Sequence, residues 1–311
     1  MKIVMFGSGA AGGAVGAYLA KAGEDVTFIA RGEHLKAMQE NGLLLTRSFL
    51  EDAEKDILIK PIKAMKAAEY NDTPDVIFVT VKYYSIEDAI DFARRVAAKD
   101  TLIIPILNVF GTGAVMQEKL SGLICLDGCM YIYAKITKPG AIEQSEELVR
   151  VIYGFRKNQP IELKEKCEEL EKILKNAKIR GHFSQNIERD ALRKFAFVSP
   201  MGATLLYYNA LSGAIQKEGE PREMFIGLIK EAVAIGEAMG IEFDVDLVET
   251  GKKFIDSSLD NLSTSMVRDV QKGGLSEFDG QVRRIVELGK KLGVPTPLYQ
   301  KVAEWGDKKG I

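Results

Sequence analysis

The sequence predicts an α/β N-terminal domain with a Rossmann-like, doubly wound sheet, followed by an all-α C-terminal domain. Short apolar segments alternate with helical segments over residues 2–107, which is typical of a parallel sheet covered by helices. From about residue 162 the apolar residues recur with the helical period, and beyond residue 184 they do so throughout. We therefore expect two domains, 1–184 and 185–311.

The opening stretch, MKIVMFGSGAAGGAVG, predicts a short buried strand, a glycine turn and a helix rich in small residues. A second strand and a second helix follow it. The expected elements of this βαβ unit are a strand over 2–7, a helix over 11–22, a strand over 25–30 and a helix over 33–41.

The alternation continues with further strands and a helix, and the second domain reads as helices only. We expect strands over 75–81 and 102–107, with a helix over 85–98 between them. Residues 122–155 predict short strands without helices, which we interpret as a small meander added to the parallel sheet. The expected helices of the second domain are 187–208, 219–239, 244–256, 263–271 and 277–292.

The composition is that of an ordinary globular protein and excludes several classes of function. The chain has 311 residues, is 46% hydrophobic and 28% charged, and carries a formal net charge of −2. That charge gives no electrostatic reason to expect binding to nucleic acid or to an anionic membrane. There is no apolar stretch of about 20 residues that could span a membrane.

The cysteines argue for a reducing compartment. There are three, Cys125, Cys129 and Cys167, with no spacing typical of metal ligands. We expect buried structural thiols, no metal site and a cytoplasmic protein. The sequence leaves open whether the chain forms a homodimer.

The glycines at the start of the chain carry the first functional signal. Gly7, Gly9 and Gly12 have the spacing G-x-G-x-x-G between a predicted strand and a predicted helix. In this pattern the first glycine allows a tight turn, the second lets the backbone approach a pyrophosphate, and the third lets the helix pack on the strand. We therefore predict a dinucleotide site, with contacts from the residues of this loop: Gly7, Ser8, Gly9, Ala10, Ala11 and Gly12.

The end of the second strand favours NADP over NAD. NAD enzymes usually place an acidic residue there to bind the ribose 2′-hydroxyl, whereas this chain has Arg31, nineteen residues after Gly12. A guanidinium can bind a 2′-phosphate with two hydrogen bonds. His34 and Lys36 could add positive charge. The alternative is that Arg31 is a solvated surface residue.

A reductase that uses such a cofactor needs a proton donor beside the reacting oxygen. Neither histidine is convincing, because His34 lies in the adenosine region and His182 falls in a predicted surface turn. Two lysines stand out, Lys82 at the end of an apolar strand and Lys194 in an apolar helix. A single lysine of this kind usually extends its ammonium to water. Asn108 ends another strand at the same predicted sheet edge.

These residues carry a resemblance to the ketopantoate reductase family, whose members reduce 2-oxopantoate to pantoate with NADPH on the way to pantothenate and coenzyme A. The resemblance covers nearly the whole chain. It rests on the segments GSGAAG, IARGEHLKAMQENGL, VTVKYYSIEDAI, ILNVFG, RKFAFVSP and SMVRDVQKGGLSEFDGQV. It implies a Rossmann domain followed by a helical domain.

The resemblance also implies roles for single residues in catalysis and substrate binding. Lys194 matches the family's catalytic lysine, the proton donor to the keto oxygen. Glu277 matches an acidic residue that pairs with this lysine or with a substrate hydroxyl. Ser265 matches a serine that binds the substrate carboxylate.

Three further positions match residues at the cofactor. Asn108 matches an asparagine that contacts both the cofactor ribose and the substrate. Lys82 matches a lysine near the nicotinamide end, and Arg31 matches the arginine that recognises the 2′-phosphate.

Two positions depart from the pattern of the pantoate-forming enzymes. Val198, one helical turn after Lys194, and Ser212 both stand where a substrate-binding asparagine is expected. A valine cannot replace the hydrogen bond of an asparagine, so the departures concern which 2-oxo acid is bound. The expected function is the reduction of ketopantoate with NADPH. The alternatives are a reductase of another branched or aromatic 2-oxo acid and a non-catalytic NADP-binding sensor.

Overall fold

The computed structural model describes residues 1–52 and 54–311, and the chain divides into two compact units. The first unit contains residues 1–107 and 111–187, and the second contains residues 108–110 and 188–311. The division falls just beyond the predicted boundary at residue 184. The assignment of residues 108–110 to the second unit was not expected from the sequence.

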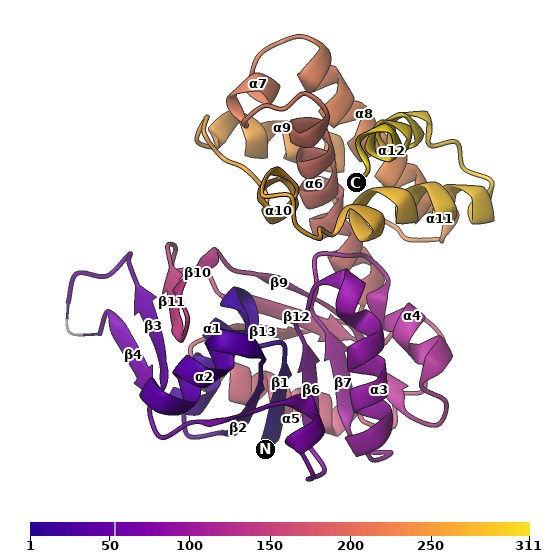
Figure 1. The fold of residues 1–311 in the computed structure, drawn as a ribbon. Coiled ribbons are helices and arrows are strands. Elements are labelled where there is room, and N and C mark those ends of the chain that lie inside the picture. The colour runs from indigo at the N-terminus through magenta and orange to yellow at the C-terminus, as the bar shows by residue number, and fades with distance from the viewer. Residues whose placement is uncertain (53) are drawn as a thin grey trace. The chain divides into compact units, whose positions relative to one another are not determined.

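A six-stranded parallel sheet with the order β5-β2-β1-β6-β7-β8 forms the centre of the first unit (Figure 1). This order, with crossovers on both sides of β1, is that of a doubly wound dinucleotide-binding sheet. The strands are β1 (Lys2–Phe6), β2 (Asp25–Ile29), β5 (Lys63–Met65), β6 (Val76–Val79), β7 (Leu102–Pro105) and β8 (Ile124–Cys125).

Both faces of this sheet are covered, so most positions in its strands are apolar. Met5 and its neighbours on β2 and β6 belong to one buried cluster, whereas Val4 and Ile77 belong to a second cluster. Successive residues of a strand point to opposite faces, and the two clusters therefore lie on opposite sides of the sheet. The helices of this region are α1 (Ala10–Lys21), α2 (Gly32–Asn41), α3 (Ile86–Val96) and α4 (Thr112–Lys119).

The meander expected over 122–155 is wrong, because most of these strands build two other sheets. A four-stranded sheet has the order β10-β11-β3-β4, and a three-stranded sheet has the order β13-β12-β9. Their bounds are β3 (Leu43–Arg47), β4 (Asp56–Ile59), β9 (Asp127–Tyr131), β10 (Ala134–Lys138), β11 (Ala141–Gln144), β12 (Arg150–Gly154) and β13 (Arg180–Phe183).

The physical reason for the difference is long-range pairing. Strand β11 pairs in parallel with β3, which precedes it by almost a hundred residues, and this pairing buries Ile142 and Leu45. Strand β13, where a surface turn was expected around His182, pairs with β12. Helix α5 (Lys164–Asn176) connects these two strands. Such pairing leaves no signal in the local period of the sequence.

The second unit is helical over its described residues. Its longest helix, α6 (Ile187–Tyr207), contains Pro200 in its interior. The other elements are α7 (Gly213–Gln216), α8 (Glu220–Ala238), α9 (Leu247–Ser257), α10 (Ser265–Gln271), the π-helical turn η3 (Asp279–Arg283), α11 (Arg284–Leu292) and α12 (Pro297–Lys309). Thus the helix expected over 277–292 is a π-turn followed by a shorter α-helix, and α12 was not predicted.

No helix among the described residues combines the length and the apolar character that a membrane crossing requires.

Candidate active site

The glycine loop between β1 and α1 has the geometry that its spacing predicts. Gly7 has φ +103°, a conformation that residues with side chains rarely adopt. A Cβ atom on Gly12 would lie 2.2 Å from both Gly7 O and Thr80 Oγ1, so only glycine lets α1 approach the loop and β6 this closely. A Cβ on Gly9 would meet nothing within 4 Å. The backbone at Gly9 is therefore open to a ligand.

Helix α1 begins at this open position without a side-chain cap. Gly9 is its N-cap residue, and its first turn has no acidic residue. The N–H groups at such a helix start are available to an anion and carry the positive end of the helix dipole. This arrangement suits a pyrophosphate.

Ser8 contributes by anchoring the loop. It is 2% exposed, its hydroxyl donates to Ile29 O at 3.1 Å, and its N–H donates to the same oxygen at 3.0 Å. Because both donors are directed at the end of β2, Ser8 holds the loop beside that strand and offers neither donor to a phosphate.

His34 fixes the same loop from the other side. Its Nε2 donates to Ser8 O at 2.9 Å, and its Nδ1 accepts from the Gly140 N–H at 3.1 Å, which sets the tautomer of the neutral ring. Burial lowers the pKa of His34, although the bond to Ser8 opposes this effect. His34 therefore connects three segments and does not supply the positive charge expected from the sequence.

Arg31 and Lys82 each follow the carboxyl end of a strand in the parallel sheet. Arg31 follows β2 as the exposed N-cap residue of α2, and its guanidinium forms no ion pair with a described residue. Lys82 follows β6 and is half-buried at the start of the turn Tyr83–Ser85. Strands β2, β1 and β6 are parallel neighbours, so both side chains share one sheet edge with the glycine loop.

In the second unit, Lys194 and Asn108 are brought together. Lys194 is only 7% exposed on α6, and its Nζ donates to Asn108 Oδ1 at 2.5 Å. The ammonium that an isolated lysine would extend into water is here enclosed and directed at an amide oxygen. Both residues were singled out in the sequence, and the structure brings them into contact.

The segment 108–110 is held against α6 and α11 by two further contacts. The rings of Phe110 and Phe195 lie 6.2 Å apart between centroids, and Arg284 Nε donates to Phe110 O at 3.1 Å. Because Phe195 is next to Lys194 in the chain, the aromatic contact fixes Asn108 beside the lysine. Sequence analysis missed Arg284, since a single arginine in a helix carries no distinctive signal.

Three other elements pack on the stretch of α6 that follows Lys194. Ser199 Oγ donates to Gln281 O in η3 at 2.6 Å and shares a second hydrogen bond, of 2.8 Å, with Tyr299 Oη. A Cβ on Gly202 would lie 3.1 Å from Thr264 Oγ1, at the start of α10. No sequence pattern indicates these contacts, because serine and glycine are common in helices.

The remaining predicted residues occupy different environments in this unit. Glu277 is 3% exposed just before η3, Ser265 is the first residue of α10, and Val198 is partly exposed one turn after Lys194. Ser212 is fully buried. Its hydroxyl donates to Leu259 O at 2.6 Å and accepts from the Leu262 N–H at 2.8 Å, so it is already engaged in holding the preceding loop of α10.

Comparison with known proteins agrees with this arrangement. The family model described as "Ketopantoate reductase PanE/ApbA" matches residues 3–157, and its C-terminal counterpart matches residues 186–307.

The chain belongs to the ketopantoate reductase family.

Relatives of this family resemble the chain over almost its full length. A 2-dehydropantoate 2-reductase of Pyrococcus horikoshii is 28% identical over 304 residues, which are 96% of this chain and 94% of the relative. The crystal structure of a 2-dehydropantoate 2-reductase from Methylococcus capsulatus is similar with a TM-score of 0.85 at 22% identity, covering 100% and 97% of the two chains.

A structure with another name shares the fold equally well. D-Mandelate dehydrogenase in a complex with NADH and anilino(oxo)acetate is similar with a TM-score of 0.86 at 22% identity, covering 98% of this chain and 96% of that one. The ketopantoate reductase fold therefore includes proteins named for different 2-oxo or 2-hydroxy acids.

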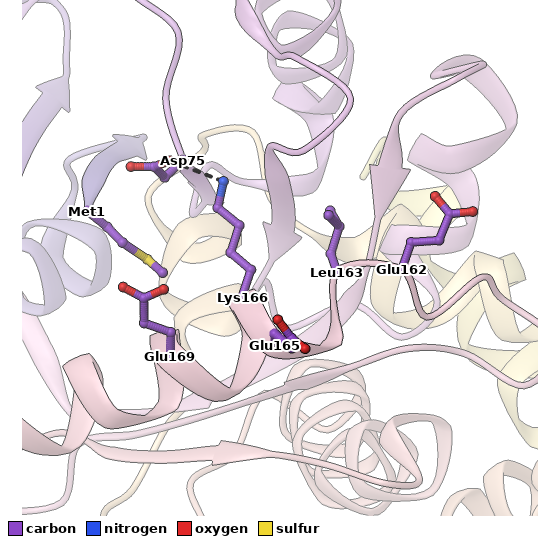
Figure 2. Close-up of a pocket in the computed structure, with 7 residues that line it drawn as sticks. All are labelled: Met1, Asp75, Glu162, Leu163, Glu165, Lys166 and Glu169. Atoms are coloured by element: carbon purple, nitrogen blue, oxygen red, sulfur yellow. Dashed lines mark ion pairs between the residues drawn. The ribbon is translucent and has the colours of Figure 1, made fainter.

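A pocket of about 570 Å³ lies at the opposite sheet edge and does not suit this family's ligands (Figure 2). Figure 2 shows Lys166 paired with Asp75, which precedes β6, at 3.1 Å. Most of the lining side chains are acidic and would repel phosphates and carboxylates. The lining residues are Met1, Asp75, Glu162, Leu163, Glu165, Lys166 and Glu169.

The cysteines are buried. Cys125, Cys129 and Cys167 have little exposure and form no disulfide among the described residues, and burial raises the pKa of Cys125 and of Cys167. Among the described residues, no group of three or more His, Cys, Asp or Glu side chains is arranged to hold a metal ion.

Proposed function

We propose that this chain reduces 2-oxo acids with NADPH, and that ketopantoate, which gives pantoate for pantothenate and coenzyme A biosynthesis, is its leading substrate. The observation that carries the proposal is the 2.5 Å hydrogen bond between the enclosed Lys194 Nζ and Asn108 Oδ1. The names of the full-length relatives support the same reaction.

The first unit provides the features that NADPH requires. The open backbone at Gly9 and the uncapped start of α1 suit the pyrophosphate, and the exposed Arg31 suits the 2′-phosphate. Lys82 and Asn108 are the proposed contacts at the nicotinamide end. When bound, NADPH supplies the hydride that reduces the keto carbon C2.

Lys194 supplies the proton in this proposal. An ammonium has three N–H donors, and directing one of them at Asn108 Oδ1 fixes the position of the nitrogen. As C2 accepts the hydride, a second N–H of Lys194 transfers its proton to the keto oxygen, which becomes the hydroxyl of the product. The lysine is left neutral and regains a proton from solvent. Because the site is enclosed, the positive charge of Lys194 stabilises the negative charge that develops on the keto oxygen more strongly than it would in water.

The proposed substrate contacts follow from the resemblance and from placement. Ser265 binds the carboxylate, and Glu277 orients Lys194 or a substrate hydroxyl. Asn108 contacts both substrate and cofactor. We leave Ser212 out of these contacts, because its hydroxyl is fully buried and already has two backbone partners.

The experiment that tests the proposal follows the absorbance of NADPH with purified protein and a panel of 2-oxo acids. We expect turnover of ketopantoate and a preference for NADPH over NADH. Binding of NADPH without turnover of any 2-oxo acid would contradict the proposal and favour the non-catalytic sensor.

A second candidate substrate class is favoured by one residue. Val198 places an apolar side chain one turn after Lys194, on the face of α6 that carries the proposed proton donor. A relative of the same fold is named for mandelate, an aromatic acid. The panel therefore includes phenylglyoxylate. Faster turnover of phenylglyoxylate than of ketopantoate would identify an aromatic 2-oxo acid as the preferred substrate and leave the proposed mechanism unchanged.

A further inference from the structure

Gln281 in the π-turn η3 has a side chain that the fold leaves without partners. It is 0% exposed, and neither Nε2 nor Oε1 has a hydrogen-bond partner in the described part of the chain. Its backbone is fully engaged, because its N–H donates to Glu277 O at 2.8 Å and its carbonyl accepts from Ser199. A buried, unpaired amide is unfavourable, so it needs an explanation in function.

The amide oxygen lies beside a position of α6 that has no side chain. A Cβ atom on Gly202 would lie 2.8 Å from Met266 Cε, 3.1 Å from Thr264 Oγ1 and 3.6 Å from Gln281 Oε1. The nearest of these groups is the flexible end of a methionine, which moves easily and can make room for a ligand. A π-turn is an uncommon feature that occurs often at functional sites, and here it directs Gln281 toward α6.

The amide lies along the same face of α6 as the proposed proton donor. Lys194, Val198 and Gly202 follow one another at intervals of four residues and form one row on the helix. Lys194 and Gly202 are separated by about 12 Å along the helix axis.

The chemistry of the amide selects the group that would bind it. An amide has a donor and an acceptor and no charge, and a hydroxyl can accept from Nε2 or donate to Oε1. A carboxylate accepts only, and a methyl or phenyl group would leave the amide unpaired.

We propose that Gln281 is a specificity-determining residue that binds a hydroxyl at the end of the 2-oxo acid remote from the keto carbon. This inference rests on the proposed reductase function. In this proposal, η3 determines the preference for a 2-oxo acid that carries this hydroxyl over one that lacks it.

The test compares two enzymes with two substrates that differ by one hydroxyl. Gln281→Met keeps a long unbranched side chain and removes both polar atoms. Ketopantoate and 3,3-dimethyl-2-oxobutanoate differ only in the hydroxyl. We expect the substitution to lower kcat/KM for ketopantoate by about 10- to 100-fold, mainly through KM, and to leave the value for the second acid within about twofold.

The matched control is Thr204→Val. Thr204 is also on α6, is 1% exposed and has a hydroxyl without a described partner. Because it does not lie on the row of Lys194 and Gly202, its replacement should change both substrates equally. Gln281→Leu repeats the experiment if the methionine variant does not fold.

Two results would overturn the inference. One is an unchanged kcat/KM for ketopantoate in the variant, and the other is an equal loss with both acids. If the wild type reduces neither acid, the proposed function fails. In that case, calorimetry in the presence of NADP compares the binding of pantoate with that of 2-hydroxy-3,3-dimethylbutanoate, which lacks the hydroxyl. If the Gln281 variant does not weaken pantoate binding selectively, Gln281 does not bind this hydroxyl.

Discussion

Lys194 is notable for its contact with Asn108. A lysine on an apolar helix would normally extend into water, but here the ammonium is enclosed and donates to an amide oxygen at 2.5 Å. The two residues are 86 positions apart in the chain. In the proposed mechanism, this contact positions Lys194 as the proton donor.

Replacing this lysine tests the assignment directly. We expect Lys194→Ala to lower kcat by at least about 10²-fold, because the transition state loses its proton donor. NADPH binding should be retained, as measured by the quenching of protein fluorescence. Lys230→Ala, which removes an exposed lysine from α8, is the control and should retain full activity. An active Lys194→Ala variant would remove this residue from the mechanism.

At the scale of elements, His34 ties three segments together. It joins α2 to the glycine loop through Ser8 O and to the turn between β10 and β11 through the Gly140 N–H. The Nδ1 contact requires a neutral ring, because a protonated Nδ1 cannot accept that hydrogen bond. The loop that faces the proposed cofactor is therefore stabilised by an uncharged histidine.

This dependence predicts a pH effect on stability. Burial lowers the pKa of His34 in the folded state below its usual value of about 6.5, so the unfolded chain binds the proton more readily. The free energy of unfolding should therefore fall as the pH is lowered through about 6.5 toward the folded-state pKa, and the contribution should be complete above that range.

Urea unfolding between pH 5 and 8 measures this contribution. His34→Gln should flatten the change, whereas His182→Gln, which removes an exposed imidazole, should retain it. If the free energy of unfolding of the His34→Gln variant depended on pH as in the wild type, protonation of His34 would not contribute to this dependence.

A second set of contacts joins elements of the helical unit. Ser199 links α6 to η3 and to Tyr299 of α12, and Glu231 of α8 accepts from the N–H groups of Leu298 and Tyr299 at 2.7 and 3.0 Å. Burial raises the pKa of Tyr299, so its hydroxyl stays protonated and able to donate. These buried hydrogen bonds hold the helix of the proposed proton donor in register with η3.

At the scale of the whole molecule, the proposed chemistry is divided between two units. The first contains the glycine loop, Arg31 and Lys82, and the second contains Lys194, Glu277 and Ser265. Asn108 belongs to the second unit although its neighbours in the chain belong to the first. Binding of the cofactor to the first unit should therefore be measurable in the absence of substrate and turnover.

Thermal unfolding tests this expectation and the cofactor preference together. A ligand that binds only the folded state stabilises it by about 2.7 kcal/mol at 100 times its Kd. We expect NADPH to raise the melting temperature more than NADH at equal concentration. Arg31→Ala should reduce the shift with NADPH to that with NADH, whereas Arg150→Ala, an exposed arginine of β12, should not. Equal shifts with both nucleotides in the wild type would argue against an NADP preference.

Much of this molecule follows from its sequence. The parallel strands, the helices that flank them and the helical C-terminal part were predicted, because apolar periodicity and glycine spacing act over a few neighbouring residues. Gly7 has the positive φ of a tight turn, and Gly12 allows the close approach of α1 to the loop, as the spacing predicts. Lys194 and Asn108 were singled out by their place in the sequence and again by the resemblance.

Only the tertiary structure decided the rest. Strand β11 pairs with β3 rather than joining the central sheet, Ser212 is occupied by backbone partners, and His34 is a neutral connector. The unpaired amide of Gln281 appears only when η3 packs on α6. Each of these depends on contacts between residues far apart in the chain, and such contacts are set by the burial of whole surfaces, which no local pattern records.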